Sequence, residues 1–375
     1  MAPLVVVFLL WLPLDEKKAA PRERQAAAGT TAFTRLAQQA EQARQAHQAA
    51  EAIDLYQRAL KLKPAWKEGW WYLGTLYYQQ DSYPECRNAF QRLTLLEPKG
   101  GAAWSMLGLC EFRTKEYELA IAHLQQGQQF GVAGVPEIDE VAKYHLALLL
   151  TRAENYEKSL DIFFELAQRG KDDPAMVAAA GIAALRMPLL PEDVPAEERE
   201  ITYLAGRAVW DAGARHSAQA QKDFEALLAK YPKAPGVHFL FGSFLLTEQP
   251  DRAIPELKKE IEISPDHVPA RVQIAFEYLR REEYAAGIPY AEQAIQLAPD
   301  SAVVHTALGR LLVETGNLQR GVAELERAEK LAPDSPQPRI ALASAYAKMG
   351  RSQDAERERR EFLRLRELYK KPGEQ

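Results

Sequence analysis

Seven histidines and several acidic residues are the parts of this chain that could carry metal or acid–base chemistry. The histidines are His47, His123, His145, His216, His238, His267 and His305. None belongs to an H-E-x-x-H spacing, which would place two ring nitrogens on one helix face to bind zinc. Adjacent acids such as Glu282 and Glu283 diverge on a helix, so they cannot converge on one substrate. We therefore predict no metal, cofactor-binding or catalytic residues, and a protein that is not an enzyme.

The two cysteines, Cys86 and Cys110, are too few for a disulfide-rich scaffold or a cysteine-based zinc site. The simplest interpretation is that both are small, buried, apolar side chains. A bond between them requires their Cβ atoms to lie close together, and the sequence leaves that alternative open.

Composition points to a folded chain with no affinity for nucleic acid. Of the 375 residues, 47% are hydrophobic and 26% are charged, as in folded soluble domains. The formal net charge is -5 and no long basic run occurs, whereas nucleic-acid binding usually needs a basic stripe. We expect a protein or peptide partner instead.

The N-terminal stretch has the composition of a leader. Residues 1–14 are mostly apolar, and the run from 4 to 14 is too short to span a bilayer as a helix. It fits the apolar core of a signal peptide or a plain leader, so the sequence leaves both an exported, periplasmic location and a cytoplasmic one open. Residues 15–32 are rich in Ala, Arg, Glu and Gln and indicate a linker. We predict no integral membrane span.

A period of 34 residues runs through the rest of the chain. Pro64 and Pro98 are 34 residues apart, and so are Pro299 and Pro333. This spacing is typical of helix–turn–helix repeats. The predicted repeats are 33–66, 67–100, 101–134, 140–173, 201–234, 235–267, 268–301, 302–335 and 336–369.

The eighth position of each repeat supports this division, because two paired helices approach closely there and a large side chain would separate them. All nine residues at this position are Gly or Ala. They are Ala40, Gly74, Gly108, Ala147, Ala208, Gly242, Ala275, Gly309 and Ala343.

Residues 174–200 fit no whole repeat. An apolar helix is expected at 176–187, followed by a loop that Pro188, Pro191 and Pro195 enforce. We interpret the segment as a degenerate repeat, although a tolerated insertion explains it too. It divides the chain into a first block of four repeats (33–173) and a second block of five (201–369), which ends in a capping helix and is followed by a tail at 370–375.

The stretch 70–98 resembles the tetratricopeptide pattern W-x-x-L-G-x-x-Y, A-x-x-x-F, P. The matching positions hold Trp70, Leu73, Gly74, Tyr77, Cys86, Phe90 and Pro98. Only Cys86 departs from the pattern, and the resemblance covers residues 33–370 apart from 174–200. It implies an all-α, right-handed superhelical solenoid of antiparallel helix pairs, whose first helices line a concave groove for a peptide or partner helix.

Positions five, nine and twelve of each first helix form the stripe next to the buried one. We predict that this stripe lines the groove through Trp71, Thr75, Tyr78, Ser105, Leu109, Phe112, Tyr144, Leu148, Phe239 and Phe276. Trp71, Tyr78, Phe112 and Tyr144 are the expected anchors, since aromatic residues often dominate binding energy. The competing interpretation is that they pack against the adjacent repeat.

The function we expect is a non-enzymatic scaffold that binds an apolar peptide or helix of a partner protein. Two alternatives remain open. One is a self-associating scaffold of the cell envelope. The other is the repeat arm of a system resembling the N-acetylglucosamine transferases, without its catalytic domain. The sequence does not give the partner's identity or the oligomeric state.

Overall fold

The computed structural model describes residues 21–132, 134–170 and 172–368, with side chains from residue 30 onward. Over these residues it contains 19 α-helices, two short 3₁₀ helices and no strand, so the predicted all-α class is confirmed. None of the described helices combines the length and apolar character needed to cross a lipid bilayer. The predicted leader at 1–14 and the tail at 370–375 lie outside the described residues.

The chain forms two compact units, divided between Leu146 and Ala147, and each is described by itself. The helices of the N-terminal unit are α1 (Pro21–Gln45), α2 (Ala49–Leu62), α3 (Lys67–Gln79), α4 (Tyr83–Leu96), α5 (Gly101–Arg113) and α6 (Tyr117–Phe130). Helix α7 (Pro136–Arg152) contains the division.

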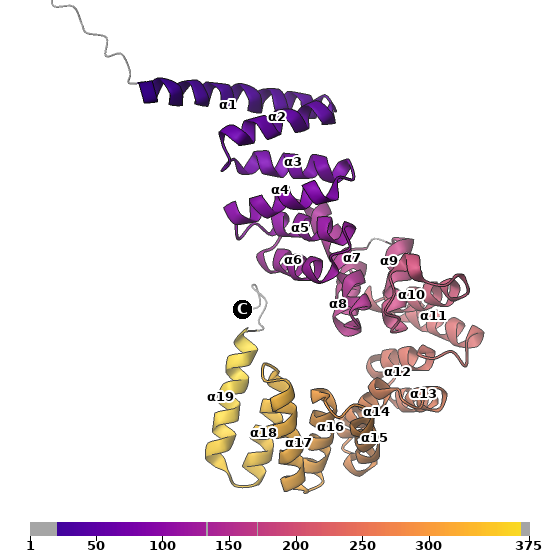
Figure 1. Ribbon diagram of the computed structural model, residues 1–375. Coiled ribbons are helices and arrows are strands. Elements are labelled where there is room, and N and C mark those ends of the chain that lie inside the picture. The colour runs from indigo at the N-terminus through magenta and orange to yellow at the C-terminus, as the bar shows by residue number, and fades with distance from the viewer. Residues whose placement is uncertain (1–20, 133, 171, 369–375) are drawn as a thin grey trace, which may run out of the picture. The chain divides into compact units, whose positions relative to one another are not determined.

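The C-terminal unit continues with antiparallel pairs. Its helices are α8 (Tyr156–Ala167), α9 (Pro174–Ala184), α10 (Arg199–Gly213), α11 (Ser217–Lys230), α12 (Val237–Glu248), α13 (Pro250–Ile263), α14 (Val268–Arg280), α15 (Tyr284–Leu297), α16 (Ala302–Glu314), α17 (Leu318–Leu331), α18 (Pro336–Lys348) and α19 (Ser352–Leu368). Within each unit, consecutive helices pack side by side as hairpins that stack on the next pair (Figure 1).

The eighth position of the repeat brings paired helices together as predicted. A Cβ atom added to Gly74 of α3 would lie 2.7 Å from the ring of Phe90 in α4. In the same way, a Cβ on Gly309 of α16 would lie 2.6 Å from Leu325 in α17. Small residues are therefore needed here because a large side chain of the second helix fills the space.

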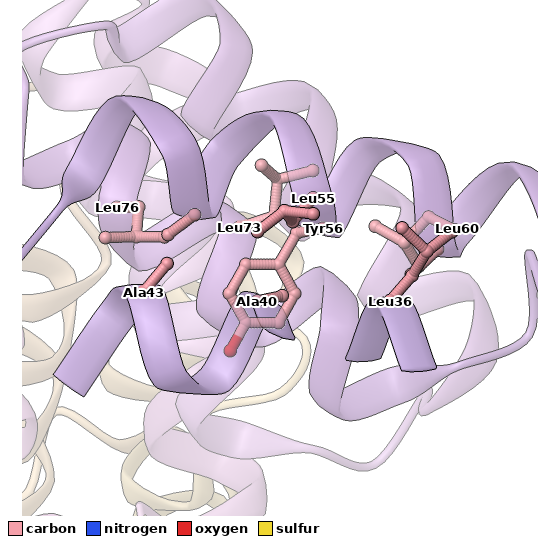
Figure 2. Packing of buried hydrophobic residues seen from close by; sticks show 10 residues of the cluster. Leu36, Ala40, Ala43, Leu55, Tyr56, Leu60, Leu73 and Leu76 are labelled. Carbon is pink, nitrogen blue, oxygen red and sulfur yellow. The ribbon is translucent and has the colours of Figure 1, made fainter. Parts of the chain in front are cut away.

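The core of the first hairpin shows how the pattern becomes packing (Figure 2). Ala40 of α1 and Tyr56 of α2 are almost fully buried, and Leu73 of α3 joins the same cluster. The small Ala40 lets the Tyr56 ring enter between the helices. Each hairpin thus shares its apolar face with the next, which is how a repeat array builds a continuous core.

Two predicted irregular segments are partly helical. Helix α1 begins at Pro21, so residues 21–32, expected as a linker, extend the first helix. Their Ala, Gln, Arg and Glu residues are strong helix formers, which explains the difference. Likewise α7 begins at Pro136, inside the loop expected before residue 140, with proline at a position where its missing N–H costs nothing.

The segment at 174–200 supplies one helix that packs on α10. The predicted helix is confirmed as α9, although it ends at Ala184. Its N-terminus is capped by the Asp173 carboxylate, which accepts from the backbone nitrogen of Ala175 at 2.8 Å. Two 3₁₀ turns, Pro191–Asp193 and Ala196–Glu198, then lead into α10. The division of the chain into repeat blocks remains a prediction.

Helix α19 ends the described chain with one apolar stripe. Leu365 exposes only 1% of its surface, whereas Leu368 exposes 68%. Leu368 is therefore not part of the buried stripe, because it is the last residue of the helix. The remaining face carries paired charges such as Arg364 and Glu361, 2.6 Å apart.

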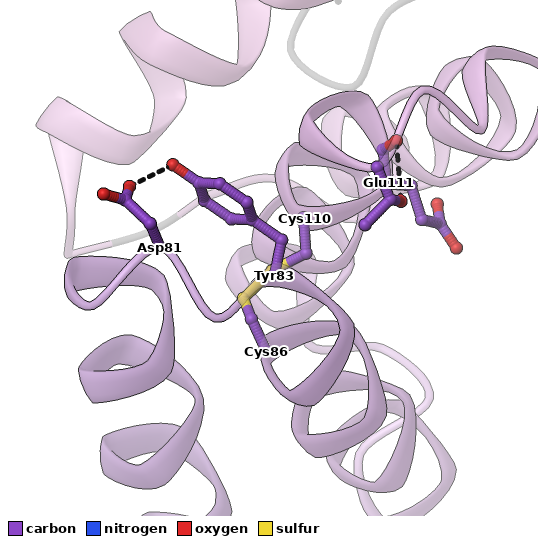
Figure 3. The surroundings of a disulfide bond; sticks show 6 residues. Asp81, Tyr83, Cys86, Cys110 and Glu111 are labelled. Atoms are coloured by element: carbon purple, nitrogen blue, oxygen red, sulfur yellow. Dashed lines mark hydrogen bonds between the residues drawn. A yellow bond between two sulfur atoms is a disulfide. The ribbon is translucent and has the colours of Figure 1, made fainter.

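A disulfide joins Cys86 of α4 to Cys110 of α5, with the Cα atoms 6.0 Å apart (Figure 3). Both residues are buried, as the sequence predicted, but they are paired rather than free. Because Cys86 occupies the small-residue position of its repeat, it faces the first helix of the next repeat at close range. The bond therefore ties two consecutive helix pairs together.

Candidate functional site

Two histidines that could have been metal ligands are tied into the repeat scaffold. His305 Nε2 donates to the carbonyl oxygen of Pro299 at 2.9 Å, and His305 Nδ1 lies 2.7 Å from Glu324 Oε2. His238 makes the same two contacts, with Pro232 at 3.0 Å and Glu256 at 2.7 Å. Over the described residues, no group of three or more His, Cys, Asp or Glu residues is arranged to hold a metal ion.

An apolar groove of about 970 Å³ lies in the C-terminal unit and is the strongest candidate for a binding site. Side chains from α8, α9, α10, α11, α12, α14 and α16 border it. Its apolar lining includes Tyr156, Leu160, Phe164, Val209, Phe224, Phe239, Leu240, Phe244, Val268, Val272 and Val303. A groove of this volume and lining is typical of sites that bury an apolar ligand.

Aromatic packing fixes one wall of the groove. The Phe244 ring lies 5.1 Å from the Phe224 ring of α11 and 6.5 Å from the Phe241 ring of its own helix. These contacts hold Phe244 half-buried, so one side of its ring faces the groove. The wall is therefore formed before any partner binds.

Polar contacts fix the other wall, where α12 meets α14. Ser243 Oγ donates to the backbone oxygen of Phe239 at 2.7 Å and to Gln273 Oε1 at 2.9 Å. The His267 ring lies 4.6 Å from the Phe239 ring, and His267 Nδ1 accepts from the backbone nitrogen of Ala270 at 3.1 Å, capping α14. Burial lowers the pKa of His267, which favours the neutral ring that this cap requires.

Charged residues border the groove at the α8–α10 end. Arg186 pairs with Glu157 at 2.7 Å, and its guanidinium lies 4.6 Å from the centre of the Tyr156 ring. Arg215 is exposed and has no ion-pair partner within the described part of the chain. The groove thus presents an apolar interior with one unpaired cation at its rim.

The predicted stripe residues of the second block divide between this groove and its surroundings. Phe239 lines the groove. Phe276 is half-buried outside it, with the Arg310 guanidinium 5.9 Å from its ring centre. Burial lowers the pKa of Arg310, because the apolar surroundings disfavour the charged form.

The four expected anchors of the first block are half-buried, and each contacts a neighbouring ring. Trp71 lies edge-on to Phe90 at 5.6 Å, and Tyr78 lies edge-on to Tyr83 at 5.7 Å. Phe112 and Tyr144 both contact His145, at 4.6 and 5.4 Å. Burial raises the pKa of Tyr78, so its hydroxyl stays protonated.

The other predicted stripe residues are less accessible. Ser105, Leu109 and Leu148 expose 5% of their surface or less. Thr75 is half-buried, and its hydroxyl donates to the backbone oxygen of Tyr72 at 2.9 Å. Their side chains support the helix pairs rather than form an open surface.

Periodicity did not reveal three residues that line the groove. Leu160 and Phe164 belong to α8, a second helix, whereas the predicted stripe considered only first helices. Phe244 lies in a first helix but at the tenth position. The one available signal was the segment at 174–200, which breaks the phase and brings α8 beside α9 and α10.

Models of the tetratricopeptide repeat match three stretches of the chain, residues 37–85, 73–131 and 278–336. They cover predicted repeats of both blocks, including the stretch 70–98. No curated protein matches the chain.

Solved structures with similar folds include two magnetosome-type entries and one peptide-binding repeat protein. "MamA 41-end from Desulfovibrio magneticus RS-1" is 16% identical, with a TM-score of 0.42, over 46% of this chain and 98% of that one. "MamA AMB-1" is 21% identical, with a TM-score of 0.39, over 44% and 98%. YrrB, titled a TPR protein with an unusual peptide-binding site, is 13% identical, with a TM-score of 0.39, over 46% and 90%. Likeness at this level carries no statement about partners.

Tetratricopeptide repeats generally serve as scaffolds for protein–protein interaction rather than as catalysts. The matched stretches and the helix pairs that carry the same period show that the chain belongs to the tetratricopeptide repeat family.

Proposed function

We propose that the chain is a non-enzymatic scaffold that binds an apolar segment of a partner protein in the groove of the C-terminal unit. The observation that carries the proposal is the apolar lining of this groove, which runs from Phe164 of α8 through Phe244 of α12 to Val303 of α16. Val303 exposes 50% of its surface, so a partner that covers it removes apolar area from water.

The groove favours an extended or helical segment with large apolar side chains. Its walls are held by the Phe224 and Phe241 rings on one side and by the hydrogen bonds of Ser243 on the other. A site that needs little rearrangement loses less entropy on binding. Arg215 at the rim gives a preference for a carboxylate next to the apolar side chains.

Selection from a displayed peptide library against the purified full chain tests the proposal. We expect enriched peptides to be rich in aromatic and aliphatic residues, and Val303→Glu or Leu160→Glu to weaken their binding by roughly tenfold or more, as burying an unpaired charge predicts. Leu297→Glu is the matched control, since Leu297 is 44% exposed on α15 and does not line the groove. Equal binding by all variants would show that the groove is not the site.

The half-buried rings of Trp71 and Tyr78 offer a second contact surface in the N-terminal unit. Their contacts with Phe90 and Tyr83 support the fold but leave part of each ring exposed. Trp71→Ala with Tyr78→Ala should therefore weaken capture of a partner that binds there. If the fold and every captured partner are unchanged, these rings only pack against their neighbours.

A further inference from the structure

A second groove, of about 940 Å³, lies in the N-terminal unit between α2 and α4. These are the second helices of consecutive repeats, so the groove is distinct from the predicted stripe of the first helices. Its floor is formed by Trp70, Leu73 and Tyr77 of α3, the residues of the repeat pattern itself. Leu60 and Leu96 add apolar side walls.

The next repeat shows why this groove is open. Trp104 occupies the position of Trp70, 34 residues later, and both indole nitrogens donate to a closing proline carbonyl, Pro98 at 2.9 Å and Pro64 at 2.8 Å. The Trp104 ring is covered by His123, whose ring lies 5.1 Å away. The residue that corresponds to His123 is Ala89, which lines the groove. The small side chain of Ala89 therefore leaves the Trp70 side of the groove uncovered.

A second exchange removes the polar lock that closes the later position. His123 Nδ1 lies 2.7 Å from Glu111 Oε2, which holds the imidazole beside Trp104. The residue that corresponds to Glu111 is Tyr77, whose hydroxyl accepts from Gln57 Nε2 at 2.5 Å instead. Two neighbouring repeats thus share a scaffold, and one carries a built-in lid where the other has a groove.

Charge indicates the kind of partner. Lys61 of α2 and Arg92 of α4 both line the groove toward the C-terminal ends of their helices, and both are exposed. Neither has an ion-pair partner among the residues that the structure describes. Glu85 lies toward the other end, near the start of α4. Next to Arg92, Leu95 exposes 69% of its surface, more than any other large apolar residue described.

We propose that this groove docks a partner segment that combines a large apolar side chain with Asp or Glu. The apolar side chain would pack on Trp70 in the space that His123 fills in the next repeat, and the carboxylate would pair with Lys61 and Arg92. The proposal does not depend on the groove of the C-terminal unit, because every residue that carries it belongs to the N-terminal unit.

Ala89→His tests the proposal by copying the lid of the next repeat. Peptides are selected from a displayed library on the full chain and then measured on both forms. We expect a class of peptides with an apolar residue next to Asp or Glu, whose binding falls at least about tenfold in Ala89→His but is unchanged in Val303→Glu. No peptide that distinguishes the two forms, or a class rich in Lys and Arg, would overturn the proposal.

A charge reversal provides a second test that does not alter the core. Lys61→Glu with Arg92→Glu should abolish binding of the acidic class and select basic peptides instead. Lys99→Glu with Lys115→Glu is the matched control, because it changes the net charge equally at exposed positions outside the groove. Equal loss with both pairs would mean that long-range charge alone attracts the peptides, and the groove would not be a specific site.

Discussion

His305 Nε2 lies 2.9 Å from the carbonyl oxygen of Pro299, six residues earlier in the chain. The same relationship joins His238 to Pro232 and Trp104 to Pro98. Each proline closes the second helix of one repeat, and its carbonyl oxygen has no backbone donor beyond the helix end. The fourth position of the next repeat therefore supplies a ring N–H that connects consecutive repeats.

Removing this donor should destabilise the array. His305→Phe keeps a ring of similar size but leaves the Pro299 carbonyl without a donor, so we expect a loss of about 1–3 kcal/mol in the free energy of unfolding. Chemical denaturation measures it. His305→Trp restores an N–H at a position where two other repeats carry tryptophan, and should recover part of the loss. Equal losses in both variants would show that the hydrogen bond is not the cause.

Gly181 should be far less tolerant of a methyl group than Gly74. A Cβ on Gly181 would lie 1.7 Å from the backbone oxygen of Thr202 in α10, whereas a Cβ on Gly74 meets only the edge of the Phe90 ring at 2.7 Å. A ring can shift, but the backbone of a packed helix cannot. We expect Gly181→Ala to cost about 2 kcal/mol or more and Gly74→Ala less. Thermal denaturation of both variants compares them, and a larger loss for Gly74→Ala would contradict the packing of α9 on α10.

The disulfide should contribute to stability through the chain that it closes. Cys86 and Cys110 are 24 residues apart, so the bond is expected to stabilise the oxidised protein by about 3 kcal/mol, from the loop-closure entropy of the unfolded chain. Denaturation with and without reductant measures this difference. Cys86→Ala with Cys110→Ala is the control, because alanine fits the small-residue position and the variant should not respond to reductant. Thiol counting on the unfolded wild type should find no free cysteine.

The cap of α14 should make stability depend on pH through His267. Burial lowers the pKa of His267 below its usual value of 6.5, and the neutral ring accepts the Ala270 N–H. The lowered pKa means that this contribution is complete above the usual pKa and is lost as the pH falls through the value in the folded state. His267→Asn keeps a capping acceptor that does not titrate. Denaturation between pH 7.5 and about 5 should show a smaller loss for the variant.

The sequence predicted the scaffold well because the repeat restricts each position. Gly and Ala at the eighth position, and the closing prolines, report close packing and helix ends that recur every 34 residues. The same reasoning placed His238 and His305 in the core, where both now have partners. What recurs in the sequence recurs in the fold.

The grooves could not be predicted in the same way, because they depend on departures from the repeat. The groove of the C-terminal unit includes Phe164 of a second helix, which lies there because α9 interrupts the phase. The groove between α2 and α4 exists because Ala89 replaces a larger residue. Trp70 and Tyr77, expected only to hold the scaffold together, line that groove. Cys86 and Cys110 needed spatial proximity that the spacing alone did not give.

Site-specific photo-cross-linking tests the central proposal most directly. A benzophenone side chain at position 247, an exposed residue of α12 that lines the groove, is irradiated with a library-selected apolar peptide, and the adducts are mapped by mass spectrometry. The same side chain at position 296, exposed on α15 outside the groove, is the control. Adducts at 247 and none at 296 are the predicted result. Adducts at 296 and none at 247 would contradict binding in the groove.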